Sequence, residues 1–86
     1  MKIIKFSAVW CPGCLVMKQV WKKVEEKYPN LDIIEYDYDI DEDEVNIYNV
    51  GDKLPVVIKF DDNDSEVGRL IGEKKENEII EFIGED

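Results

Sequence analysis

Two cysteines separated by two residues stand where an apolar strand pattern gives way to a helical one. They are Cys11 and Cys14, the only cysteines among 86 residues. The strand pattern before them carries Ile3, Ile4 and Phe6, and apolar residues recur at helical spacing over residues 17–28. At the start of a helix, free backbone N–H groups and the positive end of the dipole favour a Cys11 thiolate, the form that attacks disulfides. The pair is therefore predicted to be a redox site.

A structural disulfide and a metal site are the alternatives for this pair. In the chain-entropy treatment a loop as short as Cys11–Cys14 contributes only about 2 kcal/mol, less than a long loop would. Structural zinc takes four Cys or His ligands, and the chain has two cysteines and no histidine. A zinc site would need the cysteine pairs of two chains. We therefore expect no metal, and no cofactor other than a redox-active Cys11–Cys14 disulfide.

Charge is distributed unevenly along the chain. Residues 1–30 hold six lysines and two glutamates, a net of +4, whereas residues 31–86 hold five basic and nineteen acidic residues, a net of −14. This acidity opposes binding to nucleic acids and anionic membranes, because phosphate contacts need clustered Lys or Arg. We see no signal peptide and no apolar run of transmembrane length. We therefore expect a cytoplasmic protein, whose lone Cys-x-x-Cys pair is kept reduced.

Strand and helix patterns alternate along the chain. Strands are predicted at residues 2–8, 31–36, 56–60 and 65–71, and helices at residues 12–28, 42–48 and about 74–84. This βαβαββα order is of the α/β class. The first helical connection makes the first two strands parallel by a right-handed crossover, and the last two strands form a hairpin. We expect one domain over residues 1–86, a monomer, with helices on both faces of a four-stranded mixed sheet.

The residues around the cysteines make the chain resemble the thioredoxin family. The matching stretches are Phe6-Ser7-Ala8-Val9-Trp10-Cys11-Pro12-Gly13-Cys14, Leu54-Pro55 at the head of an apolar strand, and Ile71-Gly72 before the last helix. The resemblance covers about residues 3–84 and implies a minimal thioredoxin fold. The extra N-terminal strand and helix of a full-length thioredoxin are absent from this sequence, whose size is that of a glutaredoxin.

The resemblance also implies a role for each residue of the site. Cys11 would be the exposed attacking thiol and Cys14 the buried resolving thiol. Pro55 matches the cis-proline that faces the sulfurs, and the backbone of Leu54 would pair with an extended substrate segment. The residues expected to bind substrate are Trp10, Pro12, Gly13, Val50, Lys53, Leu54, Pro55 and Gly72.

Three positions depart from the family pattern. Lys5 falls where many thioredoxins carry a buried aspartate, and Glu35 falls near the lysine that usually partners it, which suggests a charge-swapped pair. Lys5 would either stabilise a thiolate or extend its amine to the surface. Gly13 stands where thioredoxins usually have proline. With Pro12 in the first helical turn and a thiolate at the helix tip, we expect a somewhat weaker reductant than an ordinary thioredoxin.

The leading functional interpretation is a thiol-disulfide oxidoreductase that reduces protein disulfides through Cys11 and Cys14. Its partners would be disulfide-containing client proteins and a reductase donor, either thioredoxin-reductase-like or glutathione. A glutaredoxin and a redox-sensing binding module are the alternatives. Glutaredoxins usually carry Thr-Val-Pro and Gly-Gly-Asp where this chain has Lys53-Leu54-Pro55 and Ile71-Gly72-Glu73. Although Lys53 could meet a glutathione carboxylate, these differences favour protein disulfides as substrates.

The acidic run at residues 37–44 has the first three spacings of a calcium loop, at Asp37, Asp39 and Asp41. Its sixth position is Glu42 rather than glycine, and its twelfth is Tyr48 rather than glutamate. The pattern fails where the geometry of a calcium loop is most demanding. We interpret the run as a solvated surface, with Asp39 or Asp41 capping the short helix.

Overall fold

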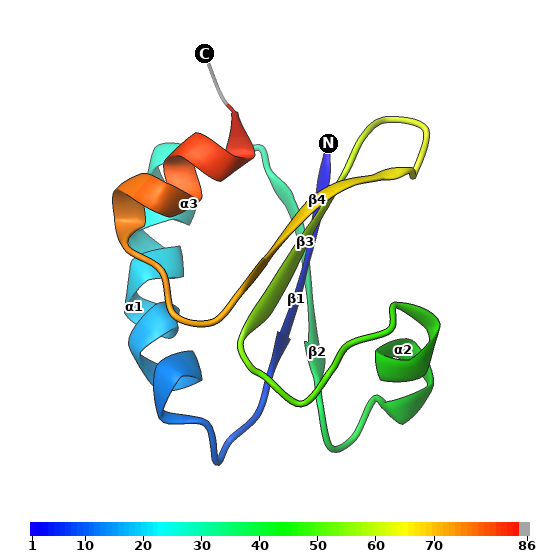
Figure 1. Cartoon of the computed structure of the whole chain (residues 1–86). Helices are drawn as coiled ribbons and strands as arrows, with labels where there is room; N and C mark the ends of the chain where they lie inside the picture. Colours follow the sequence, from blue (N-terminus) through cyan, green and yellow to red (C-terminus); the bar gives the residue numbers. More distant parts are fainter. Residues whose placement is uncertain (85–86) are drawn as a thin grey trace.

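The order of helices and strands is the one that the sequence predicts. A computed structural model describes residues 1–84 and shows the βαβαββα arrangement (Figure 1). The elements are β1 (Lys2–Ser7), α1 (Pro12–Lys27), β2 (Asp32–Asp37), α2 (Glu42–Ile47), β3 (Val56–Phe60), β4 (Glu66–Ile71) and α3 (Glu76–Ile83). The predicted bounds differ from these by one or two residues at the ends of elements.

The four strands form one mixed sheet in the order β2-β1-β3-β4. Central strand β1 runs parallel to β2 and antiparallel to β3, and Ile4 lies opposite Ile34 on one side and Ile58 on the other. Strands β3 and β4 make an antiparallel hairpin, with a register shift between Lys59 and Phe60. The carboxyl end of β1, at the centre of the sheet, therefore leads the chain directly into α1.

Helices cover both faces of the sheet, as predicted. Figure 1 shows α1 and α3 on one face and α2 on the other. Because side chains alternate along a strand, successive residues of β1 serve two separate cores. The core under α1 and α3 contains Ile3, Met17, Trp21, Val24, Val57, Ile79 and Ile83. The core on the α2 face contains Ile4, Phe6, Val45, Val50, Val56, Ile58 and Phe60.

Helix α1 is fixed to the sheet along one apolar stripe. Its buried residues, Cys14, Met17, Trp21 and Val24, recur at the spacing of one helix face. Pro12 occupies the first helical turn, where a missing N–H costs no hydrogen bond. At the other end, an ion pair of 2.8 Å joins Lys27 to Glu76 of α3. The reactive end of α1 is thus carried by a helix held along its length.

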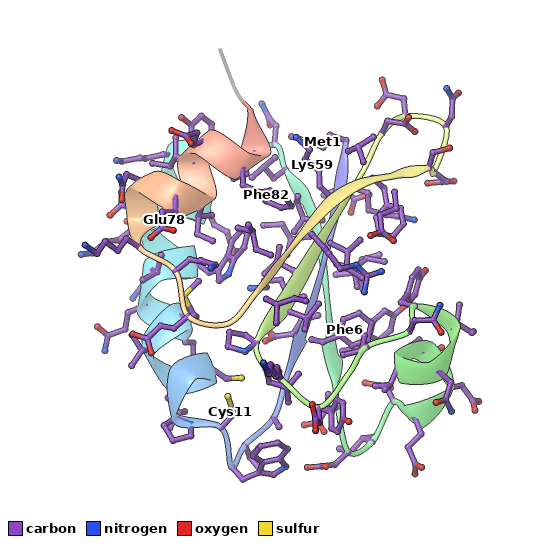
Figure 2. The ribbon with its side chains drawn as sticks, viewed as in Figure 1. Met1, Phe6, Cys11, Lys59, Glu78 and Phe82 are labelled. Carbon is purple, nitrogen blue, oxygen red and sulfur yellow. The ribbon has the colours of Figure 1, made fainter. Side chains whose placement is uncertain are left out.

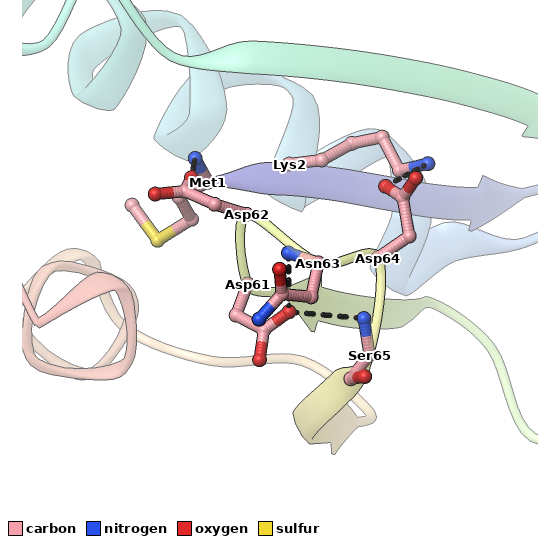
Figure 3. Close-up of polar contacts among 7 residues, drawn as sticks. All are labelled: Met1, Lys2, Asp61, Asp62, Asn63, Asp64 and Ser65. Carbon is pink, nitrogen blue, oxygen red and sulfur yellow. Dashed lines mark hydrogen bonds and ion pairs between the residues drawn. The ribbon is translucent and has the colours of Figure 1, made fainter.

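The turn between β3 and β4 closes the opposite end of the sheet. Asp61 accepts hydrogen bonds from the backbone N–H groups of Asn63 and Ser65, at 2.8 and 3.0 Å (Figure 3). The N-terminal ammonium of Met1 pairs with Asp62 at 2.9 Å. Figure 2 shows Cys11 at the other end of the molecule from Met1. These carboxylates therefore order a structural turn distant from the cysteines.

Among residues 1–84, no helix has the length and apolar character needed to span a membrane.

Candidate active site

The two cysteines share the first turn of α1. Cys11 is the N-cap residue, and its sulfur accepts a hydrogen bond of 3.2 Å from the backbone N–H of Cys14. Both residues are free thiols in the structure. The first turn of α1 therefore directs a backbone N–H at the sulfur of Cys11.

The prediction of an exposed Cys11 is wrong. The residue is only 5% exposed, and Cys14 is 8% exposed. Ala8 packs with both cysteines, and Tyr38 and Leu54 cover them from neighbouring segments. The sequence places Cys11 at the tip of a helix, but loops from elsewhere in the chain fold over that tip. Cys11 therefore presents little accessible surface to solvent.

Cys14 is a poor acid in this environment. Burial raises the pKa of the Cys14 thiol to about 12. Its hydrogen bond with Cys11 and the negative charge of Glu35 also raise that pKa, while a backbone contact with Ala8 lowers it. Cys14 is therefore a neutral thiol in the reduced protein at neutral pH. This state suits a thiol that reacts only after Cys11 has been consumed.

Pro55 lies against the turn that carries the two cysteines. The Leu54–Pro55 peptide bond is cis, which confirms the prediction made from the family resemblance. A Cβ atom on Gly13 would lie 3.5 Å from Pro55 Cδ, so the proline ring touches this turn. The N–H of Gly72 donates to the Pro55 carbonyl at 2.8 Å, and Gly72 has φ of 94°, a conformation that favours glycine. The structure thus brings four of the predicted site residues together.

Trp10 stands beside this turn with its side chain directed towards the loop after β2. The residue is 54% exposed. Its indole N–H donates a 2.7 Å hydrogen bond to Asp39, and its ring meets Tyr38 edge-on at 6.3 Å between centroids. Sequence reasoning missed Asp39 as part of the site because the residue sits in an acidic run that also fits a helix cap.

One of the predicted groove residues, Val50, lies elsewhere. Val50 is buried in the core on the α2 face, where its N–H donates to the Val45 carbonyl just after α2. Its expected place in the substrate groove is therefore wrong, because its side chain turns into the core. Lys53 is exposed in the segment leading to Leu54.

A cleft of about 550 Å³ opens beneath Cys14, between the sheet and α1. Its lining includes Lys5, Ser7, Cys14, Trp21, Glu25 and Glu35. Lys5 places its ammonium 4.9 Å from the centre of the Trp21 ring and 3.6 Å from the Glu25 carboxylate.

The predicted Lys5–Glu35 ion pair is replaced by a different arrangement. The two residues are direct neighbours across β1 and β2. The long Lys5 side chain nevertheless reaches across to α1, and Glu35 accepts a 2.9 Å hydrogen bond from the Ser7 hydroxyl. The sequence allows two expectations for Lys5, an amine at the surface or an amine that stabilises a thiolate. The structure matches neither in full: the Lys5 side chain is only 13% exposed, and its ammonium pairs with Glu25 of α1.

The acidic run forms an ordered loop. Asp37 accepts hydrogen bonds from the N–H groups of Asp39 and Ile40, and Asp41 accepts one from the N–H of Asp37. Asp41 is the N-cap residue of α2, but its side chain makes no bond to the helix N–H groups. Within residues 1–84, no three Cys, His, Asp or Glu side chains are arranged to hold a metal ion.

Comparison with known proteins gives the family. The sequence model named Thioredoxin matches residues 1–85. This chain belongs to the thioredoxin family. It is 32% identical over 84 residues to a thioredoxin of Callithrix jacchus, an alignment that covers 94% of this chain and 78% of that protein. Identity to a thioredoxin of Mycoplasmopsis pulmonis is 32% over 57 residues, covering 66% of this chain and 52% of the relative.

Solved structures agree with this thioredoxin-family assignment. Oxidised mitochondrial thioredoxin 3 of Saccharomyces cerevisiae superposes with a TM-score of 0.85 at 24% identity, covering 95% of this chain and 74% of that one. A reduced thioredoxin pre-protein of Schistosoma mansoni gives a TM-score of 0.85 at 26% identity, with the same coverage. The thioredoxin relatives support a general thiol-disulfide oxidoreductase role for this family member.

Proposed function

We propose that this protein reduces disulfide bonds in client proteins by dithiol exchange through Cys11 and Cys14. The observation that carries the proposal is the hydrogen bond from the Cys14 N–H to Cys11 Sγ at the N-terminus of α1. This contact supports Cys11 as the attacking thiolate, and the raised pKa of Cys14 supports its role as the second, resolving thiol.

The proposed reaction has two exchange steps. The Cys11 thiolate attacks one sulfur of the client disulfide; a mixed disulfide forms, and the client's other sulfur leaves as a thiolate that takes a proton from water. Cys14 then transfers its proton to water and attacks Cys11 Sγ as a thiolate. The mixed disulfide breaks, the second client thiolate leaves, and the protein keeps a Cys11–Cys14 disulfide. Two electrons have passed to the client, and a reductase donor returns them.

The surface around Cys11 supports a protein client. Trp10 and the neighbouring Val9 expose apolar area beside the cysteine turn, and Leu54 leads into Pro55 at the edge of that turn. An extended client segment would pair with the backbone of Leu54, in the manner of an added strand. The exposed Lys53 would lie at the end of this segment.

Reduction of insulin tests the proposal. The wild-type protein, kept reduced by dithiothreitol, is expected to accelerate insulin precipitation, and Cys11→Ser should abolish this acceleration. In a separate reaction without dithiothreitol, pre-reduced Cys14→Ser should instead accumulate a covalent mixed disulfide with the client, visible by mass spectrometry and released by added thiol. Absence of insulin reduction together with reversible Cys11–Cys14 oxidation would point to a redox-sensing binding module and would refute the proposal.

A further inference from the structure

The side chain of Glu73 lies on the turn that joins the two cysteines. A Cβ atom on Gly13 would be 3.6 Å from Glu73 Oε1 and 3.8 Å from Glu73 Cβ. Gly13 has no side chain, so the carboxylate of Glu73 approaches the backbone of this turn directly. This turn is the N-terminal end of α1, where the helix dipole favours a negative charge.

Two backbone contacts hold Glu73 in this place. The residue before it, Gly72, donates its N–H to the Pro55 carbonyl at 2.8 Å. The residue after it, Lys74, directs its N–H to the sulfur of Met17 on α1, at 3.3 Å. Because both neighbours are anchored, Glu73 is positioned by the fold at the edge of the site.

A carboxylate at this position interacts electrostatically with any substrate that approaches Cys11. In the proposed mode of binding along Leu54 and Pro55, a disulfide approaches the attacking sulfur beside Gly13. A negative charge there repels substrates that carry carboxylates near their disulfide and attracts substrates that carry basic groups. For unit charges roughly 6 Å apart in water, the Coulomb energy corresponds to about a threefold change in rate.

We propose that Glu73 is a specificity residue, which disfavours anionic disulfides such as those of glutathione and favours disulfides in neutral or basic protein segments. The inference rests on the proposed exchange chemistry at Cys11, and it names the substrate class of that site. Lys74 and Lys75 follow Glu73 in the sequence. A Glu73→Gln variant leaves both lysines in place and so isolates the contribution of the carboxylate.

Two disulfide reagents of different charge test this inference. The reduced protein is mixed with dianionic 5,5′-dithiobis(2-nitrobenzoate) or with neutral 4,4′-dithiodipyridine, and the second-order rates are measured. In each reaction the Cys11 thiolate breaks the reagent disulfide and releases one coloured thiol. Cys14 then closes the protein disulfide and releases the second.

The readout is the ratio of the anionic rate to the neutral rate. Glu73→Gln is expected to raise this ratio about threefold at low ionic strength, and the effect should shrink with added salt because exposed charges are screened. Glu73→Lys should raise it further. The matched control is Glu81→Gln, which removes the same charge from an exposed position near the end of α3.

An unchanged ratio in Glu73→Gln would overturn the inference. An equal rise in Glu81→Gln would overturn it too, since the effect would then come from net charge. Insulin reduction, measured on the same samples, separates this inference from the proposed function. A shifted ratio without insulin reduction would uphold the charge selectivity of the site and refute the reductase assignment.

Discussion

Asp39 holds the indole of Trp10 in place beside the cysteine turn: Trp10 Nε1 donates a 2.7 Å hydrogen bond to Asp39 Oδ2. The two residues are 29 positions apart in the sequence. The loop after β2 and the loop before α1 meet at the carboxyl ends of two parallel strands, which explains how so distant a pair comes together.

Removal of this bond is expected to impair client reduction. In Asp39→Ala the indole loses a charged acceptor, and kcat/KM for insulin should fall about fivefold, corresponding to ~1 kcal/mol. The intrinsic tryptophan fluorescence, to which Trp10 and Trp21 both contribute, should change as well. The matched control is Asp43→Ala, which removes a carboxylate from the first turn of α2 and should leave both readouts near those of wild type. Equal losses in the two variants would assign the effect to charge alone.

The raised pKa of Cys14 predicts that the reduced protein loses stability at alkaline pH. In the unfolded chain a cysteine ionises near its ordinary value of about 8.5, whereas folded Cys14 keeps its proton until about pH 12. Between these values the native state binds more protons than the unfolded state. The free energy of unfolding should therefore fall as pH rises, by at most about 1.4 kcal/mol per pH unit from this group.

Denaturant titrations at pH 7 to 11 measure this slope. The difference between reduced wild type and reduced Cys14→Ala isolates the thiol from the lysines and tyrosines that titrate in the same range. The oxidised protein is a second control, because its Cys14 carries no proton. Parallel pH profiles for all three forms would contradict the prediction.

Phe6 is expected to be a major contributor to stability. Its side chain is fully buried, with ring centroids 5.5 Å from Tyr36 and 5.9 Å from Tyr48 (Figure 2 labels Phe6 on the α2 face). Phe6→Ala should lower the free energy of unfolding by about 3–5 kcal/mol, through lost transfer energy and a residual cavity. Phe6→Leu, which keeps most of the volume, should cost less than half of this. Chemical denaturation measures both.

The order of Pro12 and Gly13 is expected to influence the reduction potential. We expect a potential above the value of about −270 mV known for thioredoxin, because the thiolate is stabilised at the start of α1. The double variant Pro12→Gly, Gly13→Pro should lower it, and a Cβ at position 13 has room at ordinary contact distances. Glu73→Gln should raise it by removing a negative charge beside the turn. Equilibration with glutathione buffers measures each potential, and a value at or below that of thioredoxin contradicts the prediction.

Local sequence signals determined the elements of this protein and the chemistry of its cysteines. Apolar residues at positions 3, 4 and 6, helical spacing from Cys14 to Val24, and Pro12 in the first helical turn predict the strand and the helix from neighbouring residues alone. The short spacing of Cys11 and Cys14 likewise predicts a redox pair, since both thiols must fall within one turn of helix.

Tertiary packing decided the properties that depend on residues far apart in the sequence. Cys11 is buried because Tyr38 and Leu54 pack against it, and Lys5 pairs with Glu25 because α1 packs on that face of the sheet. Glu73 reaches Gly13 only because Gly72 and Lys74 are anchored to Pro55 and Met17. Burial and charge at a site depend on every residue that is close in space, including residues distant in the sequence. A local sequence pattern could therefore place the cysteines at the start of a helix, but it could not predict which side chains surround them.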